Sequence, residues 1–343
     1  MYLKRLLFIL CGAIFGILCL EWSLRIYIHS QYAVGTPFRD PSRYADPLTE
    51  DTYWMLWQMW NPSPSFTLDA ELGWVGSFRP KTYLHDDRHT LQSRRPVILL
   101  GDSFSACVPE EKCFESLLEN NPTFAKSHRL LNFGVGGYGL DQITLLLEKI
   151  SPNYPDAIII FGLMTLDIDR SHLRIRESSK PFFEVHQGDF HLRGTEENKA
   201  IKLPPFPNFS ALFRLMLYSK AMPQFIKKRI TSKTKRIAEK QMRSTYLLNR
   251  ANSVLKHHEH HFLIFQPKSS IRTSTWREAH LKIWLEEHQK SSIWAKYLIV
   301  NSNPEVDLSK MFRNGDGHPT TRQNQLVSDA IANIIMRHPN PSP

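Results

Sequence analysis

The chain has 343 residues, of which 42% are hydrophobic and 22% charged, with 15 glycines and 22 prolines. This composition is typical of a globular protein and excludes a collagen-like chain, a disordered chain and a disulfide scaffold. There are 43 lysines and arginines against 33 aspartates and glutamates, which gives a net charge of +10. Nucleic acid, an anionic membrane surface and an acidic polymer all remain open as partners, because charge alone does not choose among them.

The N-terminal segment is strongly apolar. Residues 6–20 read LLFILCGAIFGILCL and contain no charged side chain. The apolar pattern continues to Ile28, so a helix over residues 2–28 reaches the roughly 20 residues that a bilayer span needs. Lys4 and Arg5 precede the run, and the positive-inside rule places them in the cytoplasm. We therefore expect a single-pass inner-membrane anchor (residues 1–28), with the rest of the chain periplasmic or extracellular.

A cleaved signal peptide and a buried core helix are the alternatives for this segment. No small-x-small cleavage site follows the run promptly, which disfavours the signal peptide. Two of the four cysteines lie in the run, and Cys107 and Cys113 lie in the part that we expect to be exported. An oxidising compartment would allow this pair to form a disulfide, and two free buried thiols are the alternative.

Residues 29–95 are polar and irregular, and we expect them to form an extension packed on the main domain. Trp54, Trp57 and Trp60 are spaced by three residues. This spacing predicts one face of a short helix that packs on the main domain. Stacking of the indole rings on sugars is the alternative.

From residue 96 onward, short apolar runs alternate with helical stretches. The expected strands are 97–100, 130–133, 157–161, 262–265 and 297–300, and the expected helices are 110–119, 140–150, 278–289 and 320–336. Strands that alternate with helices indicate crossover connections and a parallel sheet. We predict an α/β fold, a flavodoxin-like three-layer sandwich with a five-stranded parallel sheet, over residues 96–338.

Between the third and fourth expected strands lies an inserted helical or irregular region at about residues 168–255. An insertion of this size usually forms a lid or a subdomain. It contains a basic stretch from Lys220 to Arg243. We interpret the stretch as a solvated helix face, with contact to an anionic membrane or polymer as the alternative. Nucleic acid is disfavoured because no interleaved aromatic residues or base-reading motif accompany the charges.

Ligands of open α/β sheets bind beyond the carboxyl ends of the strands, so the residues that follow each strand are candidates. The first expected strand is followed by Gly101-Asp102-Ser103-Phe104, which presents a hydroxyl at the strand tip. A helix N-cap is the alternative interpretation of this serine. The second expected strand is followed by residues 134–139, GVGGYG, whose glycines let backbone N–H groups approach a ligand closely.

The glycine segment formally matches the dinucleotide-binding pattern G-x-G-x-x-G. It follows the second strand rather than the first, and no acidic residue ends a strand about 20 residues later, which disfavours nucleotide binding. Near the end of the chain, Asp316-Gly317-His318-Pro319 precedes the last expected helix. A histidine on a loop, with an acid two residues earlier, is a candidate general base.

Two further clusters contain residue types that bind metals. Residues 257–261 read HHEHH, but adjacent histidines point in different directions and rarely complete a tetrahedral site, so we expect a surface loop. Asp167, Asp169 and Asp189 are separated along the chain, and Arg170 makes salt bridges the better interpretation than a cation site. We expect no metal and no organic cofactor.

The serine after the first strand, the glycine loop after the second and the late Asp–His pair together resemble the SGNH or GDSL hydrolase superfamily. Residues 101–104 match its first block, Gly136 and its neighbours the second, and residues 316–318 the last. The resemblance covers about residues 95–338. The apolar N-terminus with residues 21–25, EWSLR, is similar to membrane-anchored bacterial members, which are often linked to acyl esters on envelope or extracellular polysaccharide.

The resemblance implies a role for each matching residue. Ser103 is the nucleophile, His318 its general base, and Asp316 the acid that orients the imidazole. Backbone N–H groups of Ser103 and of Gly136 or Gly137 form the oxyanion hole. The implied activity is an exported serine esterase or O-acyltransferase that acts on acyl esters, expected to be acetyl esters, of saccharides. Hydrolysis and transfer both remain open because they share the acyl-enzyme intermediate.

The third block departs from the family pattern. In G-x-N-D the asparagine amide contributes to the oxyanion hole, whereas this chain has Leu166 before Asp167. Loss of one such donor typically costs about 10² to 10³ in rate. Three outcomes stay open: Thr165 or another group replaces the amide, the enzyme is slow, or the chain is a catalytically impaired glycan-binding or polysaccharide-assembly protein.

Overall fold

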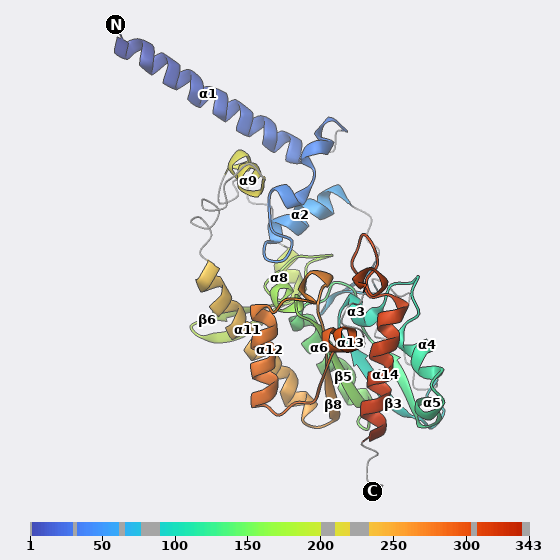
Figure 1. Ribbon diagram of the computed structural model, residues 1–343. Helices are drawn as coiled ribbons and strands as arrows, with labels where there is room; N and C mark the ends of the chain where they lie inside the picture. Colours follow the sequence, from blue (N-terminus) through green and yellow to red (C-terminus); the bar gives the residue numbers. More distant parts are fainter. Residues whose placement is uncertain are drawn as a thin grey trace.

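The computed structural model describes residues 2–29, 33–61, 66–76, 90–199, 210–219, 233–302 and 307–337. Its centre is a five-stranded parallel sheet (Figure 1) in the order β4-β3-β5-β8-β9. The strands are β3 (Arg95–Leu100), β4 (His128–Asn132), β5 (Ile158–Met164), β8 (Glu259–Phe265) and β9 (Ser292–Trp294). In chain order this is the 2-1-3-4-5 arrangement of flavodoxin-like sheets, as the sequence predicts.

The continuous apolar runs form strands because both faces of the sheet are covered. All seven residues of β5 are buried, which is typical of a parallel sheet between two helical layers. Successive side chains point to opposite faces, so Ile159 and Phe161 enter one apolar cluster and Ile158 and Ile160 the other.

Helices cover the two faces of the sheet. One layer contains α6 (Leu140–Ile150), α11 (Lys233–Leu255) and α12 (Trp276–Glu287). The opposite layer contains α4 (Phe114–Glu119), α5 (Pro122–Ser127), α13 (Ala295–Ser302) and α14 (Thr321–Arg337). The two groups lie on either side of the strands in Figure 1, which confirms the three-layer sandwich.

The fifth strand lies elsewhere than predicted. The apolar run 297–300 belongs to α13, and the edge strand is β9, which pairs with β8 through Phe262, Leu263 and Ile264. Ala295 and Ile299, four residues apart, are buried, whereas Tyr297 and Val300 are 37% and 36% exposed. Burial at a spacing of four is the helical period, so the run packs as one face of a helix.

The insertion between β5 and β8 contains helices and a hairpin. Its described elements are α7 (Asp167–Arg170), β6 (Phe182–His186), β7 (Asp189–Arg193), α8 (Thr195–Lys199) and α9 (Ala211–Tyr218), before the chain enters α11. Strands β6 and β7 pair antiparallel.

The basic stretch of the insertion is described only from residue 233 onward, so residues 220–232 lie outside the described part. Two of its cations point inward, contrary to the expectation of a solvated face. Lys240 forms an ion pair with the buried Asp169, and Arg243, only 3% exposed, donates a hydrogen bond to the Phe183 carbonyl oxygen. These cations face inward because buried acceptors lie under α11.

Helix α1 (Tyr2–His29) is long and apolar enough to cross a membrane. It projects from the rest of the chain in Figure 1, and apolar side chains such as Leu6, Phe8 and Phe15 are exposed. Its C-terminal part contacts the body of the protein. There the Glu21 carboxylate accepts hydrogen bonds from the backbone N–H groups of Ala211 (2.7 Å) and Leu212 (2.9 Å), at the start of α9.

The tryptophan spacing correctly predicts a helix, α2 (Asp51–Trp60). The three indoles do not form one packed face, because steps of three residues place Trp54 and Trp60 about 120° apart around the helix. Trp60 donates a hydrogen bond to the Ile28 carbonyl oxygen, whereas Trp57 is 40% exposed. The buried side chain of α2 is Leu56, which packs with residues of α1 and α9.

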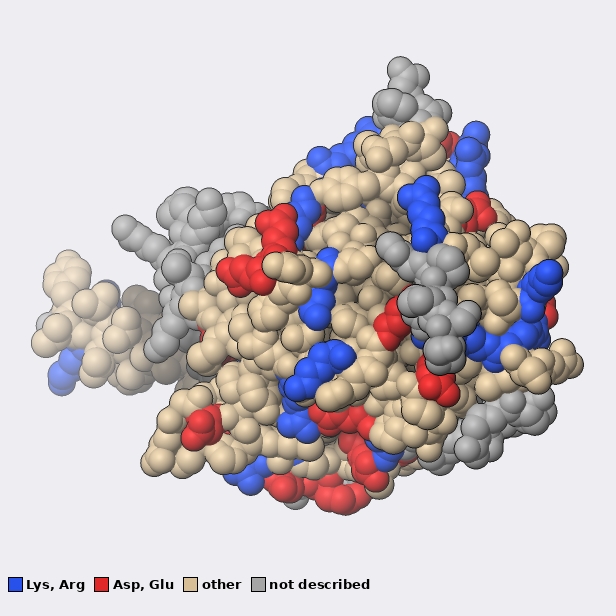
Figure 2. All heavy atoms as spheres, turned by 90° about the horizontal axis from the view of Figure 1, so that it is seen from below, with Lys and Arg blue, Asp and Glu red and all other residues tan. Residues whose placement is uncertain are grey.

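Charged side chains are intermixed on one large face of the molecule. Seen from below relative to Figure 1, the described lysines and arginines alternate with aspartates and glutamates (Figure 2). The net charge of +10 therefore does not form one continuous basic surface on this face.

Candidate active site

A cleft with a volume of about 660 Å³ lies at the carboxyl ends of the parallel strands. Segments that follow β3, β4, β5 and β8 line it, together with the loop before α14. Of the residues predicted from sequence, the lining includes Ser103, Gly136, Gly137, Asp316 and His318. Neighbouring strands β4 and β5 flank β3 on opposite sides, which is the switch point where sheets of this order bind ligands.

Ser103 is the first residue of the short helix α3 (Ser103–Ala106) and is 5% exposed. The helix cap is Asp102, whose Oδ1 accepts a hydrogen bond from the Phe104 backbone N–H at 2.9 Å. Gly101 has φ +147°, and a Cβ there would overlap the Ser105 side chain. The tight turn thus requires this glycine, and Ser103 is not the N-cap that the sequence left open.

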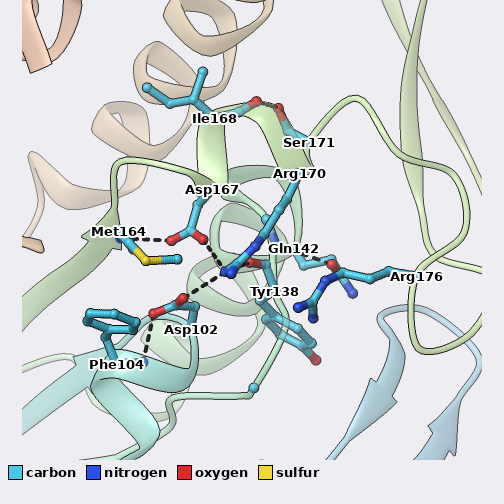
Figure 3. A network of polar contacts seen from close by, with 12 residues as sticks. Asp102, Phe104, Tyr138, Gln142, Met164, Asp167, Ile168, Arg170, Ser171 and Arg176 are labelled. Atoms are coloured by element: carbon cyan, nitrogen blue, oxygen red, sulfur yellow. Dashed lines mark hydrogen bonds and ion pairs between the residues drawn. The ribbon is translucent and has the colours of Figure 1, made fainter. Parts of the chain in front are cut away.

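A buried ion network that includes Asp102, the residue before Ser103, joins the ends of β3 and β5 (Figure 3). Arg170 Nη1 is 2.7 Å from Asp102 Oδ2 and 2.7 Å from Asp167 Oδ1. Asp167 also accepts a hydrogen bond from the Met164 backbone N–H at 2.8 Å. Both carboxylates are fully buried. The network therefore fixes the turn that carries Ser103 to the end of the neighbouring strand.

Burial and the neighbouring charges shift the pKa values of Asp167 and Arg170 in this network. Burial and the neighbouring charge of Asp102 raise the pKa of Asp167 well above its ordinary value, against the opposing effect of Arg170. Burial lowers the pKa of Arg170, but the charges of Asp167 and Asp102 outweigh it, so that pKa is raised. Arg170 accordingly stays protonated between the two carboxyl groups.

Asp316 and His318 contact each other through both backbone and side chain. Asp316 Oδ1 accepts a hydrogen bond from the His318 backbone N–H at 3.0 Å, and Oδ2 lies 3.4 Å from His318 Nδ1. Burial raises the pKa of Asp316, but this hydrogen bond and the charges of His318 and Arg313 outweigh burial and lower it. The Asp316 carboxylate thus lies on the Nδ1 side of the imidazole, and the roles of the two residues as orienting acid and general base stay predictions.

The loop of Gly136 and Gly137 is held by a residue of the N-terminal extension. Trp74, in β2 (Gly73–Val75, paired with β1, Thr67–Asp69), donates a hydrogen bond to the Gly136 carbonyl oxygen at 2.9 Å. The Tyr138 hydroxyl donates to the Trp74 carbonyl oxygen at 2.7 Å. Gly137 has φ +87°, and a Cβ there would overlap Arg176 Nη1. Side chains are therefore excluded from this position.

The end of β5 presents an apolar side chain where the resemblance would place an amide. Leu166 lines the cleft and packs against the apolar cluster beneath it. Thr165 is buried, its backbone N–H donates to the Phe265 carbonyl oxygen at 3.0 Å, and it is not among the described lining residues. A role for the Thr165 hydroxyl as an oxyanion donor stays a prediction.

The disulfide predicted between Cys107 and Cys113 is present, with the Cα atoms 5.6 Å apart. It closes the short loop between α3 and α4, directly after Ser103. The bond therefore connects the helix of the candidate nucleophile to the next helix of the fold.

Among the described residues, no group of three or more His, Cys, Asp and Glu side chains could hold a metal ion. The HHEHH segment is not the surface loop that we expected, because β8 begins at Glu259 and His261 is buried. The expected salt bridges are confirmed for Asp167, which pairs with Arg170, and for Asp169, which pairs with Lys240 and Arg277.

Sequence reasoning missed the place of Arg170 and Arg176 in the cleft lining and the contact of Trp74 with the glycine loop. Arg170 was considered only as a partner in salt bridges, whereas it lines the cleft and binds Asp102, beside Ser103. Trp74 and Arg176 contact the glycine loop from distant parts of the chain. No spacing rule connects these positions in the sequence.

No protein-family profile and no curated protein matches this sequence. Similar solved structures include a member of the lipolytic protein G-D-S-L family from Veillonella parvula (13% identity, 71% of this chain, 99% of that chain, TM-score 0.40). A psychrotrophic esterase from Pseudoalteromonas sp. is similar at 14% identity over 71% of this chain and 97% of that chain (TM-score 0.38). An acetyl xylan esterase from Geobacillus stearothermophilus is similar at 10% identity over 71% and 95% (TM-score 0.39).

Proposed function

We propose that this chain is a serine ester hydrolase of the SGNH type, with its hydrolase domain over residues 96–338. The observation that carries the proposal is the shared cleft of Ser103, the glycine loop and His318. These groups come from distant parts of the chain, and together they supply a nucleophile, N–H donors and a base. The Asp316–His318 contact adds the acid that orients the base.

In this reaction Ser103 Oγ attacks the carbonyl carbon of the ester and its proton passes to the imidazole of His318. The carbonyl oxygen becomes an oxyanion, held by backbone N–H groups of Ser103 and of Gly136 or Gly137. The C–O bond to the alcohol then breaks, and the leaving oxygen takes the proton from His318. Asp316 stabilises the imidazolium in between. Water or a sugar hydroxyl next attacks the acyl-Ser103, which gives hydrolysis or acyl transfer.

We place the hydrolase domain outside the cytoplasm, anchored in the inner membrane through α1. The apolar, exposed surface of α1 and the cations Lys4 and Arg5 before it support this topology. The Cys107–Cys113 disulfide fits an oxidising compartment. The substrate class, acyl and in particular acetyl esters of a saccharide or polysaccharide, follows from the resemblance to membrane-anchored members of the superfamily.

Leu166 favours a second candidate function. Because an apolar side chain lines the cleft where an amide donor is expected, the chain could retain the fold as a glycan-binding or polysaccharide-assembly protein with little catalysis. The presence of Ser103 and His318 in one cleft argues for the enzyme.

Labelling with a fluorophosphonate probe and hydrolysis of p-nitrophenyl acetate test the enzyme directly. The wild type should react in both assays, and Ser103→Ala should lose both reactions. Ser105→Ala is the matched control because Ser105 lies in the same helix but does not line the cleft. Equal labelling of the wild type and Ser103→Ala would remove Ser103 as the nucleophile, and an inert wild type would favour the binding protein.

A further inference from the structure

Arg176 is a positively charged residue in the wall of the cleft. The proposed mechanism gives it no role. Arg176 lines the cleft together with Ser103 and Gly136, and its side chain is 13% exposed. Its Nη1 approaches the backbone of Gly137 so closely that any side chain at that position would overlap it. In Figure 3 the guanidinium group lies beside the segment that carries Tyr138. A charged donor therefore adjoins the loop whose N–H groups form the oxyanion hole.

The guanidinium group of Arg176 is incompletely paired, unlike that of Arg170. Nη1 of Arg176 lies 3.3 Å from the Glu177 carboxylate, but among the described residues neither Nε nor Nη1 has a hydrogen-bond partner. Nη1 of Arg170 is bound to both Asp102 and Asp167. A buried donor without an acceptor has lost its hydrogen bonds to water without replacing them, which is unfavourable. A ligand oxygen that reached Arg176 would recover this cost.

The protonation state of Arg176 suits a donor. Burial, followed by the positive charge of Arg170, lowers the pKa of Arg176 to about 10. At neutral pH the group is still protonated. The repulsion between the two arginines also means that an anion in the cleft would be stabilised by both.

Helix α2 of the N-terminal extension holds Arg176 in position. The indole of Trp54 lies against the guanidinium, with Cζ 4.7 Å from the ring centroid, and Gln58 donates a hydrogen bond to the Arg176 carbonyl oxygen at 2.6 Å. Asp51 accepts hydrogen bonds from the backbone N–H groups of Arg174 (2.7 Å) and Ile175 (3.2 Å). The extension thus contacts both the side chain and the backbone of this segment.

We propose that Arg176 donates hydrogen bonds to the oxyanion formed at Ser103, in place of the amide donor that Leu166 lacks, and that α2 positions it. The inference rests on the proposed function for the reaction, but the binding of a tetrahedral anion can be measured without turnover. Arg176 neither gains nor loses a proton in the step. It stabilises the negative charge on the carbonyl oxygen while Ser103 Oγ bonds to the carbonyl carbon.

The kinetic test uses Arg176→Met with p-nitrophenyl acetate, a neutral ester that has no other charge for an arginine to bind. We expect kcat to fall by about 100-fold with KM within about threefold, because an oxyanion donor acts in the transition state. The rate of fluorophosphonate labelling should fall in parallel. A raised KM with unchanged kcat, or no change in either, would overturn the proposal.

Arg174→Met is the matched control for the kinetic test. It removes the same charge from the same segment, but Arg174 is exposed and does not line the cleft, and its backbone bond to Asp51 remains. Its kcat should stay within about twofold of the wild type. A loss as large as that of Arg176→Met would indicate a general effect of charge or of loop position and would contradict a specific donor.

The binding test measures the affinity of methylphosphonate, a stable tetrahedral anion, by calorimetry in Ser103→Ala and in Ser103→Ala/Arg176→Met. We expect the second variant to bind at least tenfold more weakly, with an unchanged melting temperature. Equal affinity would overturn the role of Arg176 even if the wild type is an active esterase. Weaker binding together with an inert wild type would retain the anion site and reject the esterase.

The positioning role of α2 predicts a smaller effect of the same kind. Gln58→Leu removes the hydrogen bond to the Arg176 carbonyl oxygen without touching the cleft, and it should lower kcat by about three- to tenfold with KM unchanged. In the Arg176→Met background the same substitution should have no further effect on kcat. Additive losses in the double variant would show that Gln58 acts independently of Arg176.

Discussion

The two walls of the cleft are stabilised by different forces. The wall formed by the loop before α14 and by α3 packs on apolar residues: the Phe104 ring lies 5.6 Å from that of His318, and Phe312 is fully buried. A disulfide adds a covalent connection after α3. The opposite wall, residues 164–180, packs through buried charges that pair with distant segments. We call them the apolar wall and the charged wall.

The difference predicts which substitutions each wall tolerates. On the charged wall, Arg170 pairs with Asp102, Lys180 with Asp141, and Asp169 with Lys240 and Arg277. Removing one member of a buried pair leaves an uncompensated charge, which is more costly than the net gain from forming the pair. The charged wall should therefore respond strongly even to substitutions that keep the size of a side chain but remove its charge.

The largest expected effect is at Lys180, whose side chain and that of its partner Asp141 are almost completely buried. Lys180→Met should lower the free energy of unfolding by about 3–5 kcal/mol, because Asp141 would be left without a counterion. Urea denaturation measures the change. Arg193→Met is the control, since its pairs with Glu184 and Glu197 are exposed to solvent, and its loss should leave the free energy of unfolding almost unchanged.

A double variant separates the charge from the packing of Lys180. In Asp141→Asn/Lys180→Met both charges are gone, so the loss should be smaller than in Lys180→Met alone. A double variant as unstable as the sum of the two single variants would show that the pair is not coupled, and the contrast between the walls would fail.

An intermediate effect is expected from the disulfide next to the apolar wall. Replacing both Cys107 and Cys113 with alanine should lower the free energy of unfolding by about 2 kcal/mol, because the unfolded chain is no longer constrained. The double alanine variant of Cys11 and Cys19, which are exposed in α1, should unfold like the wild type. If Cys107 and Cys113 react with an alkylating reagent in protein made in an oxidising compartment, the bond is not formed.

The smallest expected effect is a loss of folding stability at acid pH, which arises in the charged wall. Burial, and then the charges of Arg243, Lys240 and Lys180, lower the pKa of His172 from 6.5 to about 2. The unfolded chain binds a proton at this residue below pH 6.5 and the folded chain does not, so acid destabilises the fold from pH 6.5 downward. The slope is at most about 1.4 kcal/mol per pH unit.

His172→Gln removes this proton binding from the unfolded state. Its melting temperature should therefore fall less than that of the wild type between pH 7 and pH 5. Parallel decreases in the two proteins would show that His172 does not limit acid stability.

The sequence predicts the sheet well, and it brings the catalytic candidates to one cleft, because both depend on local patterns. The apolar runs before Ser103 and after Pro155 form strands as expected, and the Gly-Asp-Ser turn and the Asp-x-His loop line one cleft. Local patterns fail for residues 297–300, because a four-residue apolar run fits a strand and a helix equally. The run is helical because Ala295 and Ile299, one helical turn apart, are the residues buried in the fold.

The charged wall could not be predicted because its partners are set by tertiary structure. A run of lysines and arginines in α11 has the composition of a solvated face, yet Lys240 and Arg243 bind acceptors in the insertion. Arg176 reaches the glycine loop from a segment without a motif, and its supports, Trp54 and Gln58, are in the N-terminal extension. Contacts between such distant segments leave no periodic pattern in the sequence.

The contact between Glu21 and the start of α9 affects how far the cleft would lie from a membrane that α1 crosses. Residues 21–29 continue α1 as an unbroken helix of about 13 Å beyond the uncharged run, and Glu21, Leu24 and Ile28 are buried against the body of the protein. A membrane-crossing α1 would hold the cleft at a set height above the lipid headgroups instead of on a flexible tether. The substrates of the proposed hydrolase would then have to come within that height of the membrane.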